Sequence, residues 1–562
     1  MKGAAAMNKL FVLSLAVYAN ILRADSLTSV NDSVVTRSNT PIITAVLAND
    51  AVIASNQTAI LRVSQPSHGK VIINHGLVSN SELSRLFQFA AVQLSNTVVQ
   101  VADTNSYPWY TLTNGQWATD YPSDSDWITG FFPGALWLIY EHTGDTNYRN
   151  WAESWMGAIL PEQFSTNTDD VGFMINTSFG NGYRLTGNTN YKAVLLQAAE
   201  SFSNRFNGFV GCLADDNLLP PSNPPPFEVI MDTMMNSKLL YTAHDLGGSS
   251  NLYAMAVSHA GRTLTNQIRA DGSTFHMVIY NATNGAVLLQ GNRAISPPLD
   301  TWARGHAWAI NAFTTVFQET GDPRFLDAAK RTADYYINNV PADYVPWWYF
   351  TTNGALPNPP LRDSSAAAIT LSGLLQLSQL VTNSTDGTRY WQAALNVFNS
   401  LASTNYLSNG SDFSGILLHG DSVDSDTDSA LIYGDYYFIE ALKRLNDIYS
   451  QTTVTYAPDT NYVGPDAFTY QACDSSGASS TANVSIWVGV APDPAVAISK
   501  GFPSISFSTS TGVSYFIQYA NSLAADSAWN SLATNIAGTG SVFSITDTNR
   551  VSQRFYRVGV RF

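Results

Sequence analysis

A short polar turn recurs through the middle of the chain, each time between stretches with apolar residues at helical spacing. Thr143-Gly144-Asp145-Thr146-Asn147-Tyr148 recurs at 186–191 and 320–325, with looser copies at 247–250 and 386–390. The glycine suits a helix end, the next polar residue caps the following helix, and the aromatic ring packs into it. About twelve helical patterns make six hairpins, which stack to bury a shared core. Their uneven spacing of 43 to 73 residues favours a closed ring with loops at one mouth over an open solenoid.

The stretches that flank this region, 27–76 and 452–490, alternate with the period of β-strands. Val46-Leu47-Ala48-Asn49-Asp50 and the segment 65–71 resemble the start of a bacterial cadherin-like, Ig-type repeat, and 456–470 resembles its remainder. We therefore expect one discontinuous β-sandwich with a helical domain, 80–450, inserted at a hairpin tip. Two separate β fragments are the alternative. Residues 495–562 predict a further small β-sandwich.

The N-terminus has the pattern of a secretory signal over residues 1–24. Lys2 and Lys9 precede an apolar run, Leu10 to Leu22, that is too short to span a membrane. A buried N-terminal helix is the alternative. No later stretch has the apolar length of a membrane span, so we expect a periplasmic or secreted protein.

Composition excludes several classes of protein. The net charge is −15 and there is no run of Lys or Arg, which argues against nucleic-acid binding. The two cysteines, Cys212 and Cys473, exclude a disulfide framework and a cysteine-based zinc site. They lie in different predicted domains, so we expect them to stay unbridged.

Two aspartates in the helical region are candidates for acid–base chemistry. Asp170 begins an apolar helix pattern, and Asp232 interrupts the apolar run 229–235. A carboxyl buried in such a run has a raised pKa, which suits a general acid near neutral pH. A helix cap is the alternative for each, because Asp is a favoured capping residue.

Aromatic and basic residues surround these acids in the sequence. Flat aromatic faces cover the apolar side of sugar rings, although a single Trp is more often part of a core. Arg304 lies in an aromatic run and has the geometry to bind a carboxylate with two hydrogen bonds. His276 and His419 are candidate donors to a substrate, with a structural role as the alternative. The tryptophans are Trp127, Trp302, Trp308, Trp347 and Trp348.

Several short motifs together resemble glycoside hydrolase family 88, the unsaturated glucuronyl hydrolases. They occur in family order across about residues 80 to 450, and they are specific only as a set. The motifs are Trp127-x-Thr-Gly-Phe-Phe-Pro-Gly, Asp170-Val-Gly-Phe, Ile-Met-Asp232-x-Met-Met-Asn, Asp-Gly-Ser-Thr-x-His276, Gln290-Gly, Thr-Trp302-Ala-Arg304-Gly-x-Ala-Trp308, Asp363-Ser-Ser-Ala, Gly-Ile-Leu-Leu-His419-Gly and Gly434-Asp-Tyr-Tyr.

The resemblance implies an all-α (α/α)6 barrel and an unusual reaction. Family members hydrate the carbon 4–carbon 5 double bond that polysaccharide lyases leave on a terminal uronic acid, outside the retaining and inverting schemes. Asp232 is then the general acid and base, and Asp170 supports it. The implied partners are unsaturated uronic-acid oligosaccharides, with no metal and no organic cofactor. The implied lining of the sugar sites is Trp127, His276, Gln290, Trp302, Arg304, Trp308 and His419.

The chain also departs from the family pattern. Asp169 stands where the family often has His, and Gly305-His306 replaces Gly-Gln. The serines that hold the uronate carboxylate in some members have only candidates here, namely Ser364, Ser365 and Ser429.

Three other functions remain open. An unsaturated rhamnogalacturonyl hydrolase acting on pectin fragments shares the barrel and the chemistry. A non-catalytic carbohydrate-binding protein keeps the tryptophans but shows no turnover. A calcium-dependent adhesion module is suggested by the cadherin-like halves and by Asp424, Asp426 and Asp428, but Ser429 stands where a calcium loop needs Gly. The β domains are candidates for contact with polysaccharide or a cell surface.

Overall fold

The structure is a computed structural model. It describes residues 29, 31–37, 42–44, 46–47, 58–75, 81–122, 126–215, 222–292, 299–352, 355–357, 360–381, 384–422, 428–449, 451–460, 462–474, 479–489, 494–499, 501–509, 511, 513–521, 529–549 and 554–561. The predicted signal segment and Asp424 and Asp426 lie outside these ranges. Within them, no helix is long and apolar enough to cross a membrane.

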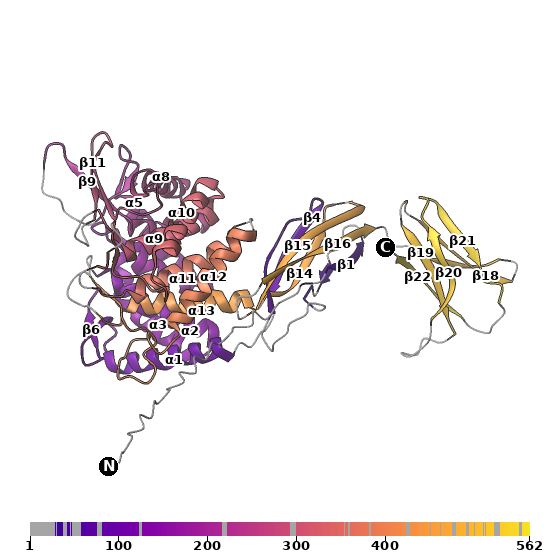
Figure 1. Ribbon diagram of the computed structural model, residues 1–562, viewed down its shortest axis with the longest axis horizontal. Helices are drawn as coiled ribbons and strands as arrows, with labels where there is room; N and C mark the ends of the chain where they lie inside the picture. Colours follow the sequence, from indigo (N-terminus) through magenta and orange to yellow (C-terminus); the bar gives the residue numbers. More distant parts are fainter. Residues whose placement is uncertain are drawn as a thin grey trace, which may run out of the picture.

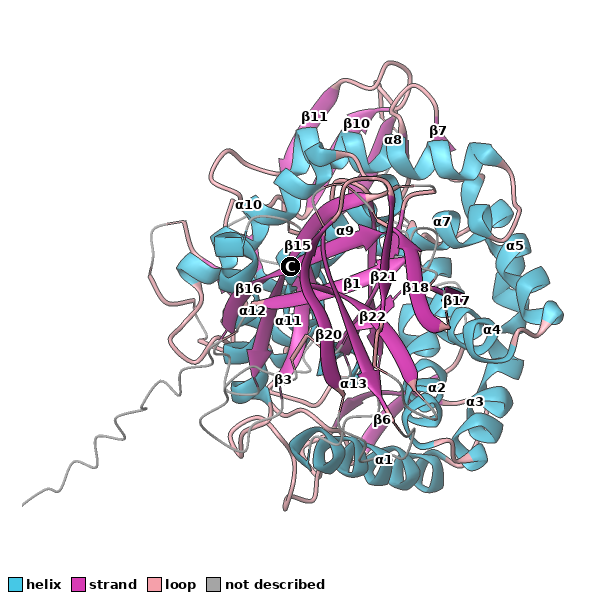
Figure 2. Ribbon diagram, turned by 90° about the vertical axis from the view of Figure 1, so that its right-hand side faces the viewer, coloured by secondary structure: helices cyan, strands magenta, loops and turns pink. Residues whose placement is uncertain are grey.

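The helical region is a ring of inner helices surrounded by outer helices (Figures 1 and 2). Each inner segment packs on the next and the last packs on the first, so the ring closes. The inner segments, in chain order, are η1 (Trp127–Gly130) with α2 (Phe131–Thr143), the π-helix η3 (Gly172–Gly180) with α4 (Asn181–Thr186), α6 (Thr233–Asn236) with α7 (Lys238–Asp245), α9 (Ala303–Thr320), α11 (Ser364–Leu380) and α13 (Ile432–Tyr449).

The outer helices have one apolar face each and pack on the inner ring with it. Inner helices such as α11 are buried along nearly their whole length, because they contact neighbours on all sides. The outer helices are α1 (Ser81–Val101), α3 (Thr146–Ile159), α5 (Thr189–Ser203), α8 (Ser250–Gln267), α10 (Pro323–Asn339) and α12 (Ser384–Leu401). The arrangement agrees with the six hairpins expected from the repeat.

The repeated turns join helices as the sequence predicts. Gly144 ends α2 with φ +69°, and the Asp145 carboxylate accepts the backbone N–H of Asn147 at the start of α3. Gly187 with Asn188 and Gly321 with Asp322 do the same at the next two copies. The loose copy at 386–390 is different, because it lies inside α12 and not in a turn. Its Gly387 is the point where the side chain of Arg62 approaches the helix.

Two β-sheets combine strands from both sides of the helical ring. In one sheet the order is β1-β16-β15-β3, and in the other it is β2-β14-β4. Strands that precede the ring therefore pair with strands that follow it, and their side chains form a separate apolar core. The strands are β1 (Asp32–Arg37), β2 (Ile42–Thr44), β3 (Thr58–Val63), β4 (Gly69–His75), β14 (Gln451–Pro458), β15 (Gly464–Asp474) and β16 (Ser479–Gly489).

A third body follows these sheets, with its own core around Ile505, Tyr515 and Ile517. Two three-stranded sheets form it, ordered β17-β18-β21 and β20-β19-β22. Figure 1 shows the two β bodies in a row on one side of the ring. The strands are β17 (Ala495–Ser499), β18 (Phe502–Ser508), β19 (Ser514–Ala520), β20 (Asn530–Ala537), β21 (Val542–Thr546) and β22 (Phe555–Arg561).

The segments that connect the helices contain short paired strands at the end of the ring away from the β bodies. The sheet β11-β10-β9 is one of these, and it carries candidate site residues. The paired segments are β5 (Tyr107–Thr111) with β6 (Trp117–Asp120), β7 (Phe206–Asn207) with β8 (Cys212–Leu213), β9 (Pro226–Ile230) and β11 (Val287–Gly291) with β10 (Met277–Asn281), and β12 (Thr301–Trp302) with β13 (Tyr349–Phe350).

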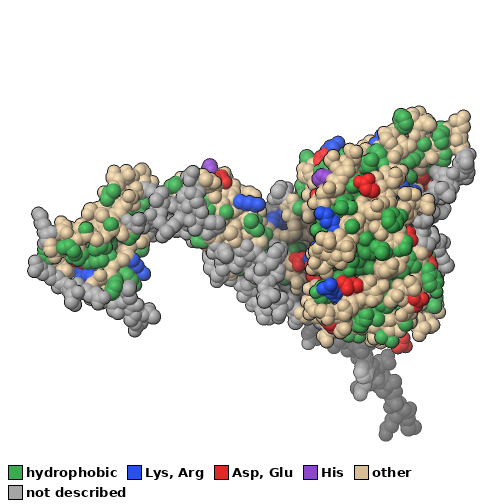
Figure 3. Space-filling model, turned by 180° about the vertical axis from the view of Figure 1, so that it is seen from behind, with side chains coloured by type: hydrophobic (Ala, Val, Ile, Leu, Met, Phe, Trp, Pro, Cys, Tyr) green, Lys and Arg blue, Asp and Glu red, His purple; other side chains and the backbone are tan. Residues whose placement is uncertain are grey.

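The surface has few charged side chains, as the composition of the sequence leads one to expect. Charged residues make up 13% of the chain, about half the usual share of about 25%. Figure 3 accordingly shows scattered Lys, Arg, Asp and Glu side chains on the visible face of the ring, separated by apolar and uncharged polar groups. Cys212 and Cys473 are both buried and free, as expected.

Candidate active site

The candidate residues gather where the inner helices begin. Asp232 occupies the N-cap position of α6, Trp302 that of α9 and Asp363 that of α11, and Asp170 lies two residues before η3. We call this end of the ring the N-terminal mouth. Helix N-termini carry a partial positive charge, so this mouth favours anionic ligands.

Asp232 and His276 form the central pair. The Nε2 atom of His276 lies 3.1 Å from Oδ2 of Asp232. The antiparallel pairing of β9 with β10 brings them together, because Ile230 lies opposite Met277. Although Asp232 stands at a cap position, its side chain makes no capping hydrogen bond. Its carboxyl group meets the imidazole instead, an arrangement in which a proton can pass between two titratable groups.

Asn236 connects the two candidate acids. Its Nδ2 atom donates to Oδ1 of Asp170 at 3.0 Å and to the backbone carbonyl of Asp232 at 3.4 Å. Its Oδ1 atom accepts the backbone N–H of Phe173 at 2.6 Å. One buried amide therefore fixes the start of η3 against the start of α6. The packing requires a glycine at 172, because a Cβ atom there would lie 2.5 Å from the Cα of Asn236.

Arg304 lies among three aromatic rings. Its guanidinium carbon is 4.7 Å from the ring centre of Trp302, 4.9 Å from that of Tyr433 and 5.5 Å from that of Trp348. Trp302 in turn lies 4.6 Å from the ring of His276. A continuous cluster of aromatic and cationic groups therefore runs from Arg304 to the Asp232–His276 pair, and all of its rings except the half-buried Trp348 are buried.

Two further buried acids flank Arg304. Its Nη1 atom donates to the backbone carbonyl of Asp421 at 2.7 Å and lies 3.8 Å from Oδ2 of Asp363. Burial raises the pKa of Asp363, and the charge of Arg304 opposes that rise. Burial, reinforced by the charge of Asp363, raises the pKa of Asp421 to about 7. The charge of this mouth therefore changes near neutral pH.

Two of the other predicted sugar-site residues lie beside this cluster. The ring of Trp127 is half-buried and 4.7 Å from that of Tyr433. His419 has φ +63°, and its carbonyl accepts the backbone N–H of Ser364 at 2.9 Å. The His419 imidazole pairs with the carboxylate of Asp428.

The structure places Trp308 and Gln290 differently from the sequence expectation. Trp308 is fully buried with its ring centre 5.2 Å from that of Phe173, so it lies beneath the site and not on its surface. The amide of Gln290 donates to the backbone carbonyl of Asn266 at 2.6 Å, toward outer helix α8. The pattern of a motif identifies its residues but does not give the direction of each side chain.

The residues that depart from the family pattern, and the candidate serines, have defined surroundings in the structure. Asp169 is buried and accepts a hydrogen bond from the hydroxyl of Thr233, next to Asp232. His306 is buried away from the acids, with Nε2 2.9 Å from the carbonyl of Thr332, and burial lowers its pKa to about 4. The hydroxyl of Ser365, one of the candidate carboxylate-binding serines, donates to Asp363 at 2.6 Å. Ser364 and Ser429 are buried.

A calcium loop at 424–435 has little support from the part that the structure describes. Asp435, which would be the twelfth residue of a calcium loop beginning at Asp424, is buried and accepts the backbone N–H groups of Ile416 and Leu417 at 2.8 and 2.9 Å. Among the described residues, no group of three or more His, Cys, Asp or Glu side chains is arranged to hold a metal ion.

Sequence reasoning did not select Asn236, Asp421 or Tyr433 as site residues. Asn236 was visible in principle, because it stands one helical turn after Asp232 in the same motif. Asp421 and Tyr433 lie far from Arg304 in the chain and no local pattern joins them to it.

Comparison with known proteins identifies the family. The sequence model of Glycosyl Hydrolase Family 88 matches residues 102–454. This chain belongs to that family. It is therefore a glycoside hydrolase, and the matched region contains every candidate site residue named above.

Related family 88 proteins cover the helical ring. The unsaturated glucuronyl hydrolase of Formosa agariphila is 36% identical over 330 residues, 58% of this chain and 80% of that protein. A crystal structure of an unsaturated glucuronyl hydrolase specific for heparin matches with a TM-score of 0.61 and 32% identity, over 66% of this chain and 99% of that one. The unsaturated glucuronyl hydrolase of Bacillus sp. GL1 matches with a TM-score of 0.60 and 26% identity, over the same shares. These neighbours have the α/α-barrel fold, in agreement with the closed ring.

Proposed function

We propose that this family 88 enzyme removes the 4,5-unsaturated uronic acid from the non-reducing end of lyase-generated oligosaccharides. The observation that carries the proposal is the Asp232–His276 pair, linked to Asp170 through Asn236 at a mouth of positive helix ends. The carboxylate of a terminal uronic acid suits that electrostatic environment. Arg304 and its aromatic neighbours form the adjoining cluster, in which the half-buried ring of Trp348 suits the flat ring of an unsaturated sugar.

The reaction is a hydration of an enol ether. Asp232, as the acid, adds a proton to carbon 4, and the oxygen of a water molecule forms the bond to carbon 5. Asp232, now a carboxylate, takes one proton of that water, and the other proton stays on the new hydroxyl group at carbon 5. The resulting hemiketal opens to a ketone at carbon 5, and carbon 1 then releases the aglycone as an alcohol. Asp170, held by Asn236, keeps a negative charge beside the cationic transition state.

The relatives named above support a proposal for the substrate class. One of them is specific for heparin, and another degrades glycosaminoglycan. We infer that this enzyme accepts unsaturated disaccharides of the glycosaminoglycan type.

The direct test follows the near-ultraviolet absorbance of the conjugated uronate during incubation with lyase-made disaccharides. The panel covers chondroitin, hyaluronan, heparin, ulvan and pectin types. We expect absorbance to fall with at least one glycosaminoglycan disaccharide. A fall with the pectin type alone would replace the proposal with the rhamnogalacturonyl activity. Stable absorbance with every substrate, from folded protein, would contradict both and favour a binding role.

We further infer that the β bodies act outside the cytoplasm. The supporting observations are the Lys2 and Lys9 signal pattern, the cadherin-like motifs and the pairing of strands across the inserted ring. A cadherin-like sandwich that hosts the enzyme would hold it near polysaccharide or a cell surface. Cell fractionation tests the export, and retention of the protein in the cytoplasm would contradict it.

A further inference from the structure

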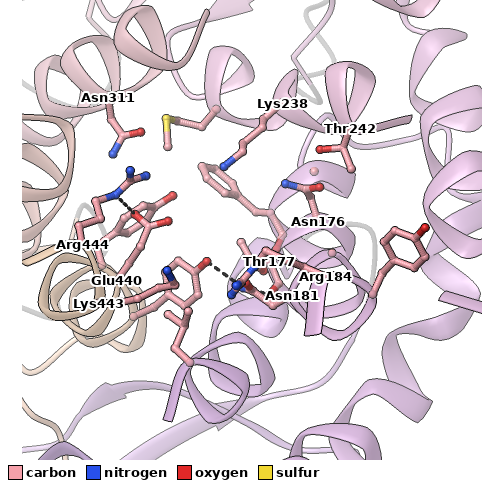
Figure 4. Close-up of a pocket in the computed structure, with 18 of the residues that line it drawn as sticks. Asn176, Thr177, Asn181, Arg184, Lys238, Thr242, Asn311, Glu440, Lys443 and Arg444 are labelled. Carbon is pink, nitrogen blue, oxygen red and sulfur yellow. Dashed lines mark hydrogen bonds and ion pairs between the residues drawn. The ribbon is translucent and has the colours of Figure 1, made fainter. Parts of the chain in front are cut away.

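A cavity of about 480 Å³ is lined by inner segments of the ring, and neither Asp170 nor Asp232 is part of its lining (Figure 4). Its lining runs from Gly172 and Phe173, which begin η3, to Glu440 and Asp447 in the second half of α13. An α-helix rises 1.5 Å per residue, so Glu440 lies about 12 Å along α13 from the mouth at Ile432. The volume is within the range of small-molecule sites, about 300 to 1,000 Å³.

Four cations line this cavity, and three of them have acid partners. Arg184 lies in the last turn of α4, and Lys443 and Arg444 lie in the second half of α13. Cations are favoured near these negative helix ends, so structure alone accounts for the three. Their shortest ion-pair distances are Arg184–Glu141 at 2.6 Å, Lys443–Asp447 at 2.5 Å and Arg444–Glu440 at 3.7 Å.

Lys238 is the fourth cation, and its situation is different. It makes no hydrogen bond or ion pair with the residues that the structure describes, and its ammonium points into the cavity (Figure 4). Lys238 begins α7, where the helix dipole opposes a positive charge. Burial lowers its pKa, and Glu440 and Glu319 only partly oppose this. A partly buried charge without a close partner costs stability, so packing does not explain a lysine here.

Uncharged polar groups face the same space. The amide of Asn176 and the hydroxyl of Thr242 line the cavity, and neither side chain has a hydrogen bond within the described part of the chain. Phe173, Tyr436 and Tyr437 add aromatic lining. The cavity thus combines one surplus positive charge, free hydrogen-bonding groups and flat aromatic surface. That set matches a small molecule with one carboxylate and several hydroxyls.

We propose that this cavity is a second binding site, for a small sugar acid, whose carboxylate pairs with Lys238 and whose hydroxyls bind Asn176 and Thr242. The site contains neither Asp170 nor Asp232 and does not depend on the reaction proposed for them. Two sources share the required chemistry, namely an ordinary saturated uronic acid and the keto acid that the enzyme releases.

The test is isothermal titration of the full chain with glucuronate and, separately, with the keto acid product. We expect saturable binding of at least one acid, weakened at least tenfold in Lys238→Met. The matched control is Lys192→Met on outer helix α5, which should bind as the unaltered protein does. Neutral methyl glucoside should bind at least tenfold more weakly than the acid. The acid that binds more tightly is then the natural source of the ligand.

Thermal unfolding provides a second readout that also reports folding. Without ligand, Lys238→Met should unfold at the same temperature as the unaltered protein or higher, because it removes an unpaired, partly buried charge. The acid should raise the unfolding temperature of the unaltered protein and of Lys192→Met, but not of Lys238→Met. Equal binding by Lys238→Met, or no binding of either acid at millimolar concentration, would overturn the proposal. Turnover of unsaturated disaccharides should be unchanged in both variants, so failure here is distinguishable from failure of the proposed reaction.

Discussion

At the scale of single residues, the site depends on side chains that hold other side chains. Asp232 and Asp170 stand just before the starts of separate helices, and the amide of Asn236 makes a hydrogen bond to each of the two residues. Arg304 is held by three aromatic rings and by the carbonyl of Asp421. The geometry of the acids therefore depends on residues that do not take part in the chemistry.

Asn236→Ala tests this dependence. The change removes the hydrogen bond to Asp170 and leaves the buried N–H of Phe173 without its partner, which costs about 1 to 3 kcal/mol of unfolding free energy. Misplaced acids should lower kcat by about 10- to 100-fold. Denaturant unfolding and steady-state kinetics measure the two effects. The control is Asn150→Ala, at an exposed position of α3. Unchanged kcat would show that Asn236 does not position the acids.

The raised pKa of Asp421 leads us to expect that stability and KM both depend on pH. Its pKa is raised from an ordinary 3.8 to about 7, so the folded protein binds a proton that the unfolded chain releases between these values. The contribution of Asp421 to the unfolding free energy therefore falls as pH rises from about 4 to 7, and is constant above that. Ionisation beside Arg304 should also raise the KM for an anionic substrate as pH passes 7.

Asp421→Asn should remove both effects, whereas Asp412→Asn at an exposed loop should keep them. The measurements are KM and unfolding free energy between pH 5 and 9. A KM profile that is the same in Asp421→Asn and the unaltered enzyme would assign the pH dependence to another group.

At the scale of helices and turns, glycines at two kinds of position have different roles. Gly144 has φ +69° and open space around it, so Gly144→Ala should cost only the strain of a left-handed residue, about 1 kcal/mol. Gly172 has no room for a side chain against Asn236. Gly172→Ala should therefore destabilise the protein more than Gly144→Ala does and should also lower kcat. Thermal unfolding and kinetics of both variants check this, and equal effects would contradict it.

The same elements show what the sequence could and could not predict. The repeat around Gly144, Gly187 and Gly321 predicted the helix boundaries correctly, because caps are local and depend on few residues. The same pattern wrongly predicted a turn at 386–390, where Asp386 and Gly387 lie within α12, which contacts Arg62 of the first β body. The direction of Gln290 and the burial of Trp308 also escaped prediction, because long-range packing decides where a side chain points. The catalytic roles of Asp170 and Asp232 remain predictions from motifs.

At the scale of the whole molecule, the chain passes twice between the first β body and the ring. Arg62 of β3 donates to the carbonyl of Val381 at 2.8 Å, and Gln471 of β15 donates to Thr388 at 2.8 Å. These contacts join the sheets to the ends of α11 and α12. The C-terminal body, in contrast, has its own core and sheets.

Two truncations test this organisation. A chain that ends at residue 493 keeps every strand of the first β body, so its ring should unfold at the same temperature as in the full chain. A chain that ends at 450 loses β14, β15 and β16 and leaves β1 to β4 without their partners. Exposed strand edges promote aggregation, so this shorter chain should be poorly soluble. Thermal unfolding and size-exclusion chromatography distinguish the cases, and equal behaviour of the two truncations would contradict the shared sheets.

The central claim is that Asp232 supplies the proton that hydrates the unsaturated uronate. The most direct measurement compares kcat of Asp232→Asn with that of the unaltered enzyme, by near-ultraviolet absorbance on the preferred disaccharide, with substrate binding measured by calorimetry. We predict a loss of kcat of about 100- to 10,000-fold, the usual range for removal of a general acid, with binding and folding retained. Turnover within tenfold of the unaltered enzyme would contradict the account and would require a different acid.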